Sequence, residues 1–574
     1  MKNLNHKVDL CIVGGGMAGI CAAIAAARHG TKVALMQDRP VLGGNASSEI
    51  RMWICGAQGP NNRETGILEE IQMENLYRNP TPNYSLWDSI LYEKVRFEKN
   101  IELLLNCSCT DAKMNGNKIE SIKGWQLTTE TWHTVEAKYF ADCSGDSILS
   151  PLSGAEFRQG REDSNEFNES IEPAKSDKKT MGMSCLFQIR ETNKPQTFIP
   201  PAWAHKYTTD EDFPARDHDT KTNYWWIELG GENDTIHDAE ELRDELLKIV
   251  FGVWDHMKNY GDHGVDNWEI DWIGFLPGKR ESRRNVGDYI LNQNDIASEG
   301  KFEDLVAYGG WSMDDHHPAG FKYTGGYPTI FHASPSPFGI PYRCLYSVNI
   351  ENLFFAGRNI SGTHAAMSAT RVMATCSIIG HAVGTAAAIA VNKDLTPREV
   401  YEKEIQNLQQ MLMEDDCYLP WQNREISKLT SKVLITDNAY NTEVLRNGSD
   451  RPIGIEDNGW TGNLGDFVEY SFENAEQISE LRFVFDSNLN RAIHNMPCNY
   501  PLEQNDFHVP ESMVKEFKIE ALDELGNWVL VAEVKNNYQR LVKLQVDVKT
   551  KSIRFIPVST WGSEKAHVFS LDLS

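Results

Sequence analysis

We predict an α/β fold with an inserted α+β domain and a C-terminal all-β sandwich, because the sequence changes character three times. It opens with an apolar strand, a glycine-rich turn and an alanine-rich helix. A tryptophan-rich region follows, after which a short strand and a helix of small residues return. From about residue 430 the chain alternates between apolar and polar side chains, which is typical of strands with one buried face.

The N-terminal stretch has the order strand, turn, helix, strand. Residues 8–13 and 33–36 are short apolar runs, and residues 17–29 between them are helix-like and rich in alanine. This is the context that the dinucleotide-binding fingerprint requires. The N-terminus of the helix would offer free N–H groups and the positive end of its dipole to phosphates.

The turn itself has the spacing G-x-G-x-x-G. Gly14 allows a tight turn, Gly16 lets the backbone approach a pyrophosphate, and Gly19 lets the helix pack closely on the strand. The residue that usually holds the ribose hydroxyls is Asp or Glu, but here it is Gln37, and Asp38 follows one place late. Because an amide can also bond a hydroxyl, we predict a dinucleotide site in which Gln37 contacts the ribose.

Composition limits the partners. The chain has 574 residues, too many for one core, and its 82 acidic residues against 56 basic ones give a net charge of −26. An acidic surface repels nucleic acid and anionic lipid, so we expect neither as a partner. The eleven cysteines are scattered and odd in number, and residues 1–7 are polar, so we expect a cytoplasmic protein without a signal peptide.

The longest uncharged run, residues 372–391, is long enough to span a membrane, but its many alanines favour a buried helix. It belongs to a returning segment, in which residues 352–356 form a strand and residues 362–392 a long helix of small residues. The N-terminus of this helix can point at the cofactor.

The middle of the chain has a different composition and contains seven of the 15 tryptophans. We interpret it as a second domain inserted between two parts of the first. The predicted segments are 1–155 (cofactor domain, first part), 156–343 (inserted substrate domain), 344–395 (cofactor domain, returning part), 396–429 (helical linker) and 430–574 (β-sandwich).

Three separated motifs agree with this arrangement: VGGGMAG at 13–19 with LGGNASSEIRM at 42–52, ADCSGD at 141–146, and NLFFAGRNISGTHAAMSATRVMATCSIIGHAVGTAAA at 352–388. Together they resemble the FAD-dependent oxidoreductases of the glutathione-reductase-like flavoprotein fold, in particular a bacterial branch with a GGN-x-SSE segment and a late AGR helix. The resemblance covers about residues 8–395. The late motif favours FAD over NAD, since a simple NAD enzyme has no reason to keep it.

The resemblance also implies which residues bind FAD. The first motif would hold the pyrophosphate and the ADP part through Gly14, Gly15, Gly16, Met17, Ala18, Gly19, Gln37, Asp38, Arg39, Gly43 and Gly44. Asn45, Ser47 and Ser48 would lie towards the flavin ring, and Asp142, Ser144, Gly145 and Asp146 would form the second cofactor segment. The late motif would contribute Gly357, Arg358, Ser361, His364, Arg371 and Met373, the last four at the pyrimidine edge of the ring. A helix N-terminus there would stabilise charge on reduced flavin.

The C-terminal region resembles a galactose-binding-like β-sandwich. The features that carry the resemblance are Gly459-Trp460-Thr461-Gly462, the strand 467–472 and the segment 479–486. The alternative is a sandwich that only stabilises the enzyme or its dimer, since a fold does not imply a function.

A flavin enzyme that oxidises an alcohol needs a base for the hydroxyl proton, and histidine suits this role. His317 and His316 lie in the cluster WSMDDHHP at 311–318, and His364 lies in the returning segment. We predict His317 as the base, oriented by Asp315, with His316 and His364 as the other candidates.

The cluster PGKRESRR at 277–284 is the other concentration of charge. Arg280, Arg283 or Arg284 could clamp an anionic substrate. The alternative, which we favour slightly, is a buried network that fixes the inserted region on the cofactor domain.

The sequence therefore predicts an FAD-dependent oxidoreductase that oxidises a hydroxyl of a sugar or glycoside by hydride transfer to flavin N5. One alternative is a reductase of the fumarate-reductase type acting on an activated C=C bond, and another is a carbohydrate-binding protein with a structural flavin. We expect a small-molecule substrate, no metal site and no membrane partner. The electron acceptor is unknown, and a homo-oligomer is left open.

Overall fold

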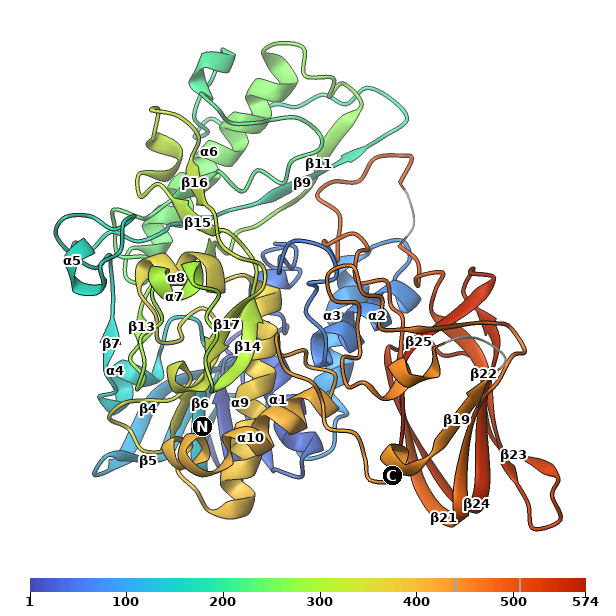
Figure 1. The fold of residues 1–574 in the computed structure, drawn as a ribbon. Coiled ribbons are helices and arrows are strands. Elements are labelled where there is room, and N and C mark those ends of the chain that lie inside the picture. Colours follow the sequence, from blue (N-terminus) through green and yellow to red (C-terminus); the bar gives the residue numbers. More distant parts are fainter. Residues whose placement is uncertain (438–440, 505–506) are drawn as a thin grey trace. The chain divides into compact units, whose positions relative to one another are not determined.

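The computed structural model describes residues 1–437, 441–504 and 507–574 (Figure 1). Residues 438–440 and 505–506, which fall within the predicted domain 430–574, lie outside the described residues. The chain forms two compact units from discontinuous segments. Unit 1 comprises Met1–Ala57, Pro82–Leu408 and His494–Asp506, and unit 2 comprises Gln58–Thr81, Gln409–Ile493 and Phe507–Ser574.

Unit 1 is built on a mixed sheet with the strand order β3-β2-β1-β6-β5-β4, and β18 also pairs with β6. Its parallel strands are β1 (Lys2–Val13), β2 (Val33–Met36), β3 (Ile101–Leu104), β6 (Thr131–Asp142) and β18 (Leu353–Phe355). The hairpin strands β4 (Cys107–Asn115) and β5 (Lys118–Gln126) are antiparallel to their neighbours.

The carboxyl ends of the parallel strands lie at one edge of this sheet. Val13 is paired with Met36 and with Asp142, and Asp142 is paired in turn with Phe355. Ligands of open α/β sheets bind outside this edge. Strands β2 and β18 and the last four residues of β1 and β6 are buried, so the parallel strands are covered on both faces where they approach this edge.

Helices α1 (Met17–Arg28) and α9 (Met373–Lys393) pack against each other at two glycines. A Cβ on Gly380 would lie 2.1 Å from the backbone oxygen of Ala18, and one on Gly384 would lie 2.2 Å from that of Ala22. The small residues of α9 thus let two helix backbones touch, and this fixes the start of α1 beside the sheet edge.

We expect Gly380→Ala to lower the free energy of unfolding of unit 1 by about 1–3 kcal/mol, because the new methyl group meets backbone that cannot rotate away. Urea unfolding followed by tryptophan fluorescence measures this. Gly362→Ala is the matched control, since its Cβ would make contacts of 3.4 Å or longer. Equal midpoints for the two variants would contradict the proposed close contact of α1 and α9.

The predicted long helix over 362–392 is two helices, α8 (His364–Thr370) and α9. They are separated because Val372 is extended, with ψ 144°. Among the described residues, α9 is the helix that is long and apolar enough to cross a membrane, and 94% of its apolar window is buried inside the protein. The sequence prediction of a buried helix there agrees with this burial.

The inserted region has its own apolar cluster, in which Trp226, Trp254 and Trp268 are buried. By contacts it belongs to unit 1 and is not a separate unit. The elements that matter below are α6 (Ala239–Asn259), β15 (Met313–His316) and β16 (Thr329–His332). The remaining elements of unit 1 are α3 (Tyr84–Arg96), α4 (Leu149–Ser153), α5 (Ser164–Phe167), α7 (Gln293–Ala297), β7 (Phe157–Arg158), β8 (Met183–Ser184), β9 (Phe187–Glu191), β10 (Glu228–Leu229), β11 (Trp268–Ile273), β12 (Gly278–Lys279), β13 (Arg284–Asn285), β14 (Leu305–Gly309) and β17 (Phe338–Pro341), and α10 (Pro397–Glu414) runs across the boundary at residue 408.

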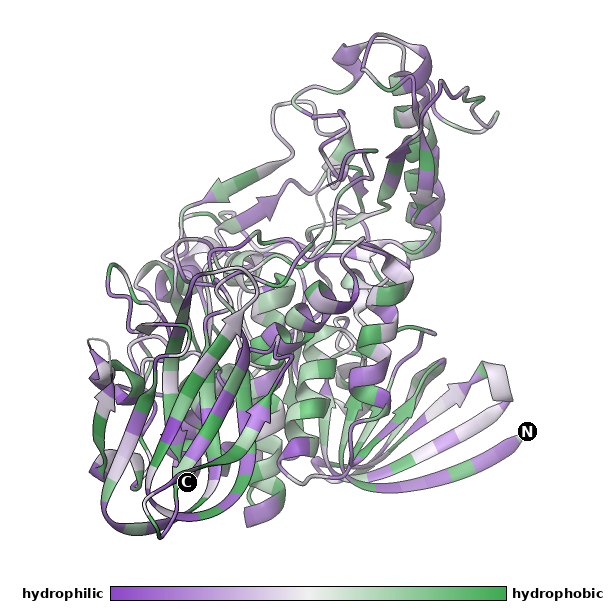
Figure 2. Ribbon diagram, turned by 90° about the vertical axis from the view of Figure 1, so that its right-hand side faces the viewer, coloured by the Kyte–Doolittle hydropathy of each residue, from purple (hydrophilic) through white to green (hydrophobic). Residues whose placement is uncertain are grey.

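Unit 2 contains an antiparallel sheet with the order β20-β25-β21-β24-β22-β23, and β19 pairs with β21. These strands alternate between hydrophobic and hydrophilic residues (Figure 2), and Phe483, Phe485, Phe517 and Phe555 form the centre of the core. The all-β prediction is confirmed, but the strands join in one curved sheet (Figure 1). Its strands are β19 (Leu434–Asp437), β20 (Trp460–Asn463), β21 (Val468–Phe485), β22 (Val514–Leu522), β23 (Trp528–Val534), β24 (Leu541–Thr560) and β25 (Lys565–Leu573).

The boundaries of the units differ from the predicted segments at three places, the first being that residues 409–429, predicted as part of a linker, lie in unit 2. Helix α2 (Ile67–Arg78), predicted within 1–155, lies in unit 2. Glu69 of this helix binds Arg491, and Tyr77 stacks on Tyr538 with ring centres 4.0 Å apart. Conversely, residues 494–506 lie in unit 1, where the side chain of Asn495 accepts a hydrogen bond from the backbone of Ile54.

Candidate functional site

A cavity of about 820 Å³ lies at the carboxyl edge of the sheet in unit 1. Residues after β1, β2, β6 and β18 line one side of it, together with the start of α9. The inserted region lines the other side with Ser184, Trp225, His316 and Tyr327. The cavity therefore lies between the part predicted to bind a cofactor and the part predicted to bind a substrate.

Two glycine turns form one wall of the cavity. Gly14 has φ +105°, and a Cβ there would lie 2.3 Å from the backbone oxygen of Cys143, so only glycine fits. Gly43 and Gly44 also have positive φ, and Gly16 bridges to Gly43. A Cβ on Gly16 would meet nothing closer than 3.9 Å. The backbone here is bare and faces open space at the start of α1, which suits a pyrophosphate group.

Gln37 does not have the role that the sequence predicts. It lines the cavity but is only 2% exposed. Its Oε1 accepts a hydrogen bond of 2.7 Å from the backbone N–H of Gly15, and its Nε2 donates to the oxygen of Val41. Both polar atoms of the amide therefore hold the glycine turn in place. The next two residues, Asp38 and Arg39, also line the cavity, and their side chains are the ones near this turn that could contact a ribose.

The segment after β6 divides into a structural part and an exposed part. Asp142 is buried and accepts hydrogen bonds from the backbone N–H groups of Ser144 and Leu149, so it shapes the turn and does not line the cavity. Asp146 does line it and binds Arg358 and Lys279, each at 2.8 Å. Burial alone would raise the pKa of Asp146, but these two cations hold it at about 2.

Most of the predicted cofactor residues come together in this cavity, and some do not. Those that line it are Gly14, Gly16, Met17, Ala18, Gln37, Asp38, Arg39, Gly43, Gly44, Asn45, Ser144, Gly145, Asp146, Gly357, Arg358, Arg371 and Met373. Those that lie behind its wall are Gly15, Gly19, Ser47, Ser48, Asp142, Ser361 and His364. Ser361 and His364 fall outside because α9, not α8, begins at the cavity.

Three buried donors in the cavity wall have no hydrogen-bond partner among the described residues. They are Nε of Arg358, Nε of Arg371 and Nε1 of Trp311. Buried polar groups in proteins are almost always hydrogen-bonded. Phosphate, flavin and substrate oxygens are acceptors of the kind these donors require, so the residues present fit an FAD molecule with a polar substrate beside it.

His316, on strand β15, lines the cavity and is 3% exposed. Its Nδ1 lies 2.6 Å from Oε2 of Glu228, and its Nε2 lies 3.3 Å from Oδ2 of Asp314. Arg280 lies 3.3 Å from Glu228, and Arg371 lies 3.1 Å from Asp314. Burial would raise the pKa of Glu228, but Arg280 and His316 lower it to about 2, so this carboxylate stays charged.

His317, the predicted base, does not line the cavity. Its ring stacks on Tyr323 with ring centres 3.8 Å apart. Asp315 does not orient it, because Oδ1 of Asp315 lies 3.2 Å from Nε2 of His364 instead. The reason is the alternation of β15, which turns residues 314 and 316 to the cavity and residue 315 to the opposite face. Asp314 was not predicted as a site residue, although the spacing D-x-H on a strand could have revealed it.

His364 belongs to a buried charged network. Its Nδ1 lies 2.8 Å from Oε2 of Glu281. Burial lowers the pKa of His364, but Glu281 and Asp315 outweigh this and raise it well above the usual range. Arg284 binds Glu281 and Glu162 in the same network. The structural interpretation of the arginine cluster therefore holds for Arg284, whereas Arg280 and Arg283 line the cavity.

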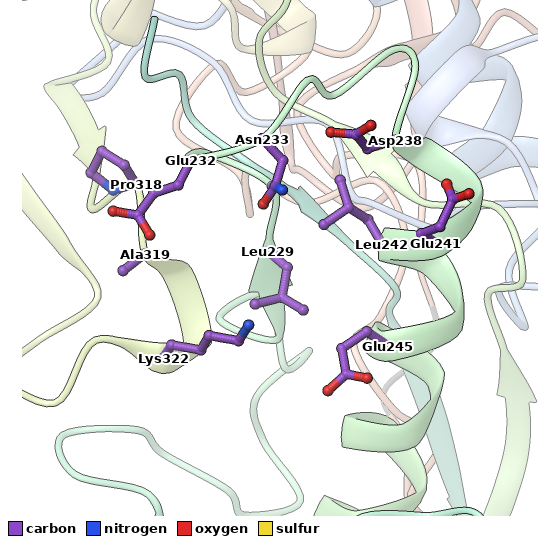
Figure 3. Close-up of a pocket in the computed structure, with 11 residues that line it drawn as sticks. Leu229, Glu232, Asn233, Asp238, Glu241, Leu242, Glu245, Pro318, Ala319 and Lys322 are labelled. Atoms are coloured by element: carbon purple, nitrogen blue, oxygen red, sulfur yellow. The ribbon is translucent and has the colours of Figure 1, made fainter. Parts of the chain in front are cut away.

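A second hollow of about 610 Å³ lies beside helix α6 (Figure 3). Asp238, Glu241 and Glu245 line it from the helix side, and Lys322 lies across from them. Of the residues that the structure describes, none of the candidate cofactor or catalytic residues lines this hollow.

Comparison with known proteins gives one extended match and several partial ones. A family model described as FAD dependent oxidoreductase matches residues 9–412. The tRNA uridine 5-carboxymethylaminomethyl modification enzyme MnmG 1 of Fusobacterium nucleatum is 24% identical over 261 residues, which is 36% of this chain and 41% of that enzyme. The chain thus matches less than half the length of this relative.

Two solved structures are similar to a quarter of the chain. The family 32 carbohydrate-binding module from Streptococcus pneumoniae EndoD is 14% identical and covers 26% of this chain and 99% of its own, with a TM-score of 0.21. The family 32 module from Clostridium perfringens NanJ in complex with galactose is 11% identical and covers 25% and 95%, with a TM-score of 0.19.

The family model spans well over half of the chain, and it includes every residue that lines the cavity except His494. The glycine turns, the buried donors and the strand edge described above all lie within it. The chain therefore belongs to the FAD-dependent oxidoreductase family, and it is an enzyme with FAD as its cofactor.

Proposed function

We propose that this enzyme oxidises a hydroxyl group of a sugar or glycoside, with His316 as the base. The observation that carries the proposal is the position of His316 in the cavity wall, between Glu228 and Asp314. This places the proposed base one residue before the one that the sequence predicts.

The cofactor would lie along the sheet edge. The strand order β3-β2-β1-β6 supports a Rossmann-type arrangement, in which the turn after the first strand receives the pyrophosphate. Gly16, Gly43 and Gly44 would hold that group, and the start of α9 at Met373 would face the flavin. Arg358 has a donor atom, Nε, that could bond ribose or phosphate oxygens, and Arg39 also lines the cavity.

FAD bound in this cavity would supply the acceptor for the hydride that leaves the substrate carbon. In the neutral form of His316, with its proton on Nδ1, the Nε2 atom would take the hydroxyl proton once the substrate hydroxyl replaces Asp314 as its partner. Glu228 accepts a hydrogen bond from Nδ1–H and stabilises the ring once it carries both protons, as the carboxylate of a Ser-His-Asp triad does. Asp314 and Arg371, which line the same cavity, could form hydrogen bonds with the neighbouring hydroxyl groups of the substrate.

The lining of the cavity supports a sugar as the substrate class. Trp225, Tyr327 and Phe331 lie on the same wall as His316, and the ring of Trp225 is 5.1 Å from that of His316. Aromatic faces pack against the C–H faces of sugars, while carboxylate and guanidinium groups fix the hydroxyls. A cavity with apolar walls and a few convergent polar groups is the usual form of a small-molecule site.

Anaerobic titration of the purified holoenzyme tests the proposal. We expect one or more members of a panel of sugars and glycosides to bleach the visible absorption of the bound flavin, with free FAD and the same sugars as the control. A flavin that no sugar bleaches, but that a C4 unsaturated dicarboxylate reoxidises after chemical reduction, would overturn the proposal in favour of a reductase. If the flavin responds to neither class of compound, the proposal is wrong and the flavin has a structural role.

A further inference from the structure

Four side chains of the inserted region, Asp210, His218, His256 and His263, converge at a point that plays no part in the proposed reaction. One ligand atom from each of them lies within 4.8 Å of every other. We propose that these four residues form a structural zinc site. The proposal is independent of the proposed function.

The distances suit a tetrahedral ion. Oδ1 of Asp210 lies 3.0 Å from Nε2 of His256, 3.6 Å from Nε2 of His218 and 3.7 Å from Nε2 of His263. Zinc bonds to nitrogen and oxygen are about 2.0–2.2 Å long, so the ligand atoms of a tetrahedral site are separated by about 3.3–3.5 Å. The three rings pack around the carboxylate with centres 4.7–5.3 Å apart.

The surroundings of the cluster also favour a metal. Nδ1 of His218 lies 2.8 Å from the backbone oxygen of Arg216. A proton on that nitrogen leaves Nε2 with a lone pair facing the other ligands, which is the usual arrangement for a metal-bound histidine. The ring of Phe213 packs on His218 and His256 and keeps this side apolar. His263 would exchange its contact of 3.2 Å with the oxygen of Tyr260 for the metal.

The role follows from the ligand count and from the positions of the ligands. Four protein ligands close a tetrahedral site and leave no position for a substrate or an activated water, as in structural zinc sites. His256 lies near the end of α6, whereas the other three ligands come from the long loop before it and the short loop after it. Zinc would therefore join two loops to helix α6, in which the side chain of His256 is buried. No metal site was predicted from the sequence, and residues 210, 218, 256 and 263 show no short ligand spacing that would have indicated one.

Metal analysis of the full chain tests the site. We expect protein that has been stripped with a chelator and dialysed against Zn²⁺ to retain one zinc per chain, and Co²⁺ in its place to give the intense visible bands of tetrahedral coordination. His218→Ala and His263→Ala should each weaken zinc binding by on the order of 100-fold or more, since even residues behind a ligand change metal affinity 10–100-fold. Both substitutions are in loops, so these variants keep helix α6 intact.

His205→Ala is the matched control, because His205 belongs to the same region but binds Glu245 and lies outside the cluster. It should retain one zinc per chain with unchanged affinity. If the double variant His218→Ala/His263→Ala retains as much zinc as the natural chain, the proposal is wrong. It is also wrong if Co²⁺ gives only the weak bands of octahedral coordination. Should a variant misfold, circular dichroism would show it, and His263→Asn, which keeps a polar side chain in the loop, would replace it.

Discussion

Replacing His316 with glutamine is expected to lower kcat for the sugar substrate by about 10²–10⁴-fold while the FAD content stays unchanged, because a positioned base contributes this much to a proton transfer. His316 lines the cavity, and Glu228 holds its Nδ1 at 2.6 Å. Glutamine can keep a hydrogen bond to Glu228 but cannot take a proton. Stopped-flow reduction of the flavin measures the step directly, and the absorption spectrum of the purified variant gives its FAD content.

The adjacent histidine provides the control. His317 stacks on Tyr323 and does not line the cavity, so His317→Gln should keep kcat within about twofold and unfold at nearly the same temperature. Glu228 is a positioning residue in this scheme. Glu228→Gln should lower kcat less than His316→Gln and change KM little. Loss of kcat in His317→Gln together with normal turnover in His316→Gln would return the role of the base to the residue predicted from sequence.

The cofactor half of the site could be predicted from sequence because its signals are local. Gly14 and Gly16 are set by the geometry of one turn, and the returning segment carries its own motif around Gly357. Such signals depend on backbone conformation over a few residues, which the sequence determines directly. The all-β character of unit 2 has the same origin, since period-2 alternation is also local.

The half of the cavity that holds the proposed base could not be predicted in this way, because it depends on which face of a strand each residue takes. Neighbouring residues of β15 point to opposite faces, so a shift of one residue in the strand exchanges His316 with Asp315. The partner of His316 is Glu228, 88 positions earlier in the sequence. The hydrogen bonds of Gln37 to Gly15 and Val41 likewise could not be predicted from the spacing of residues in the sequence.

Arg284→Met is expected to lower the free energy of unfolding by about 3–5 kcal/mol, the usual cost of removing one partner of a buried ion pair. Arg284 is 1% exposed and binds Glu281, Glu162 and the backbone oxygens of Gly160 and Gly362. Without it, two carboxylates remain buried with fewer partners. Urea unfolding measures the loss, and Arg283→Met is the control, since Arg283 lines the cavity and carries no ion pair among the described contacts.

A double variant separates a structural network from an anion clamp. If Arg284 stabilises buried carboxylates, Arg284→Met/Glu162→Gln should be more stable than the sum of the two single losses predicts, because the second substitution removes a charge that the first left unpaired. An arginine that clamps an anionic substrate would show a different pattern. Its loss would raise KM for that substrate and leave the unfolding midpoint unchanged, and Glu162→Gln would restore nothing. Additive losses in stability, or a pure effect on KM, would therefore contradict the network that the burial of Arg284 and Glu162 implies.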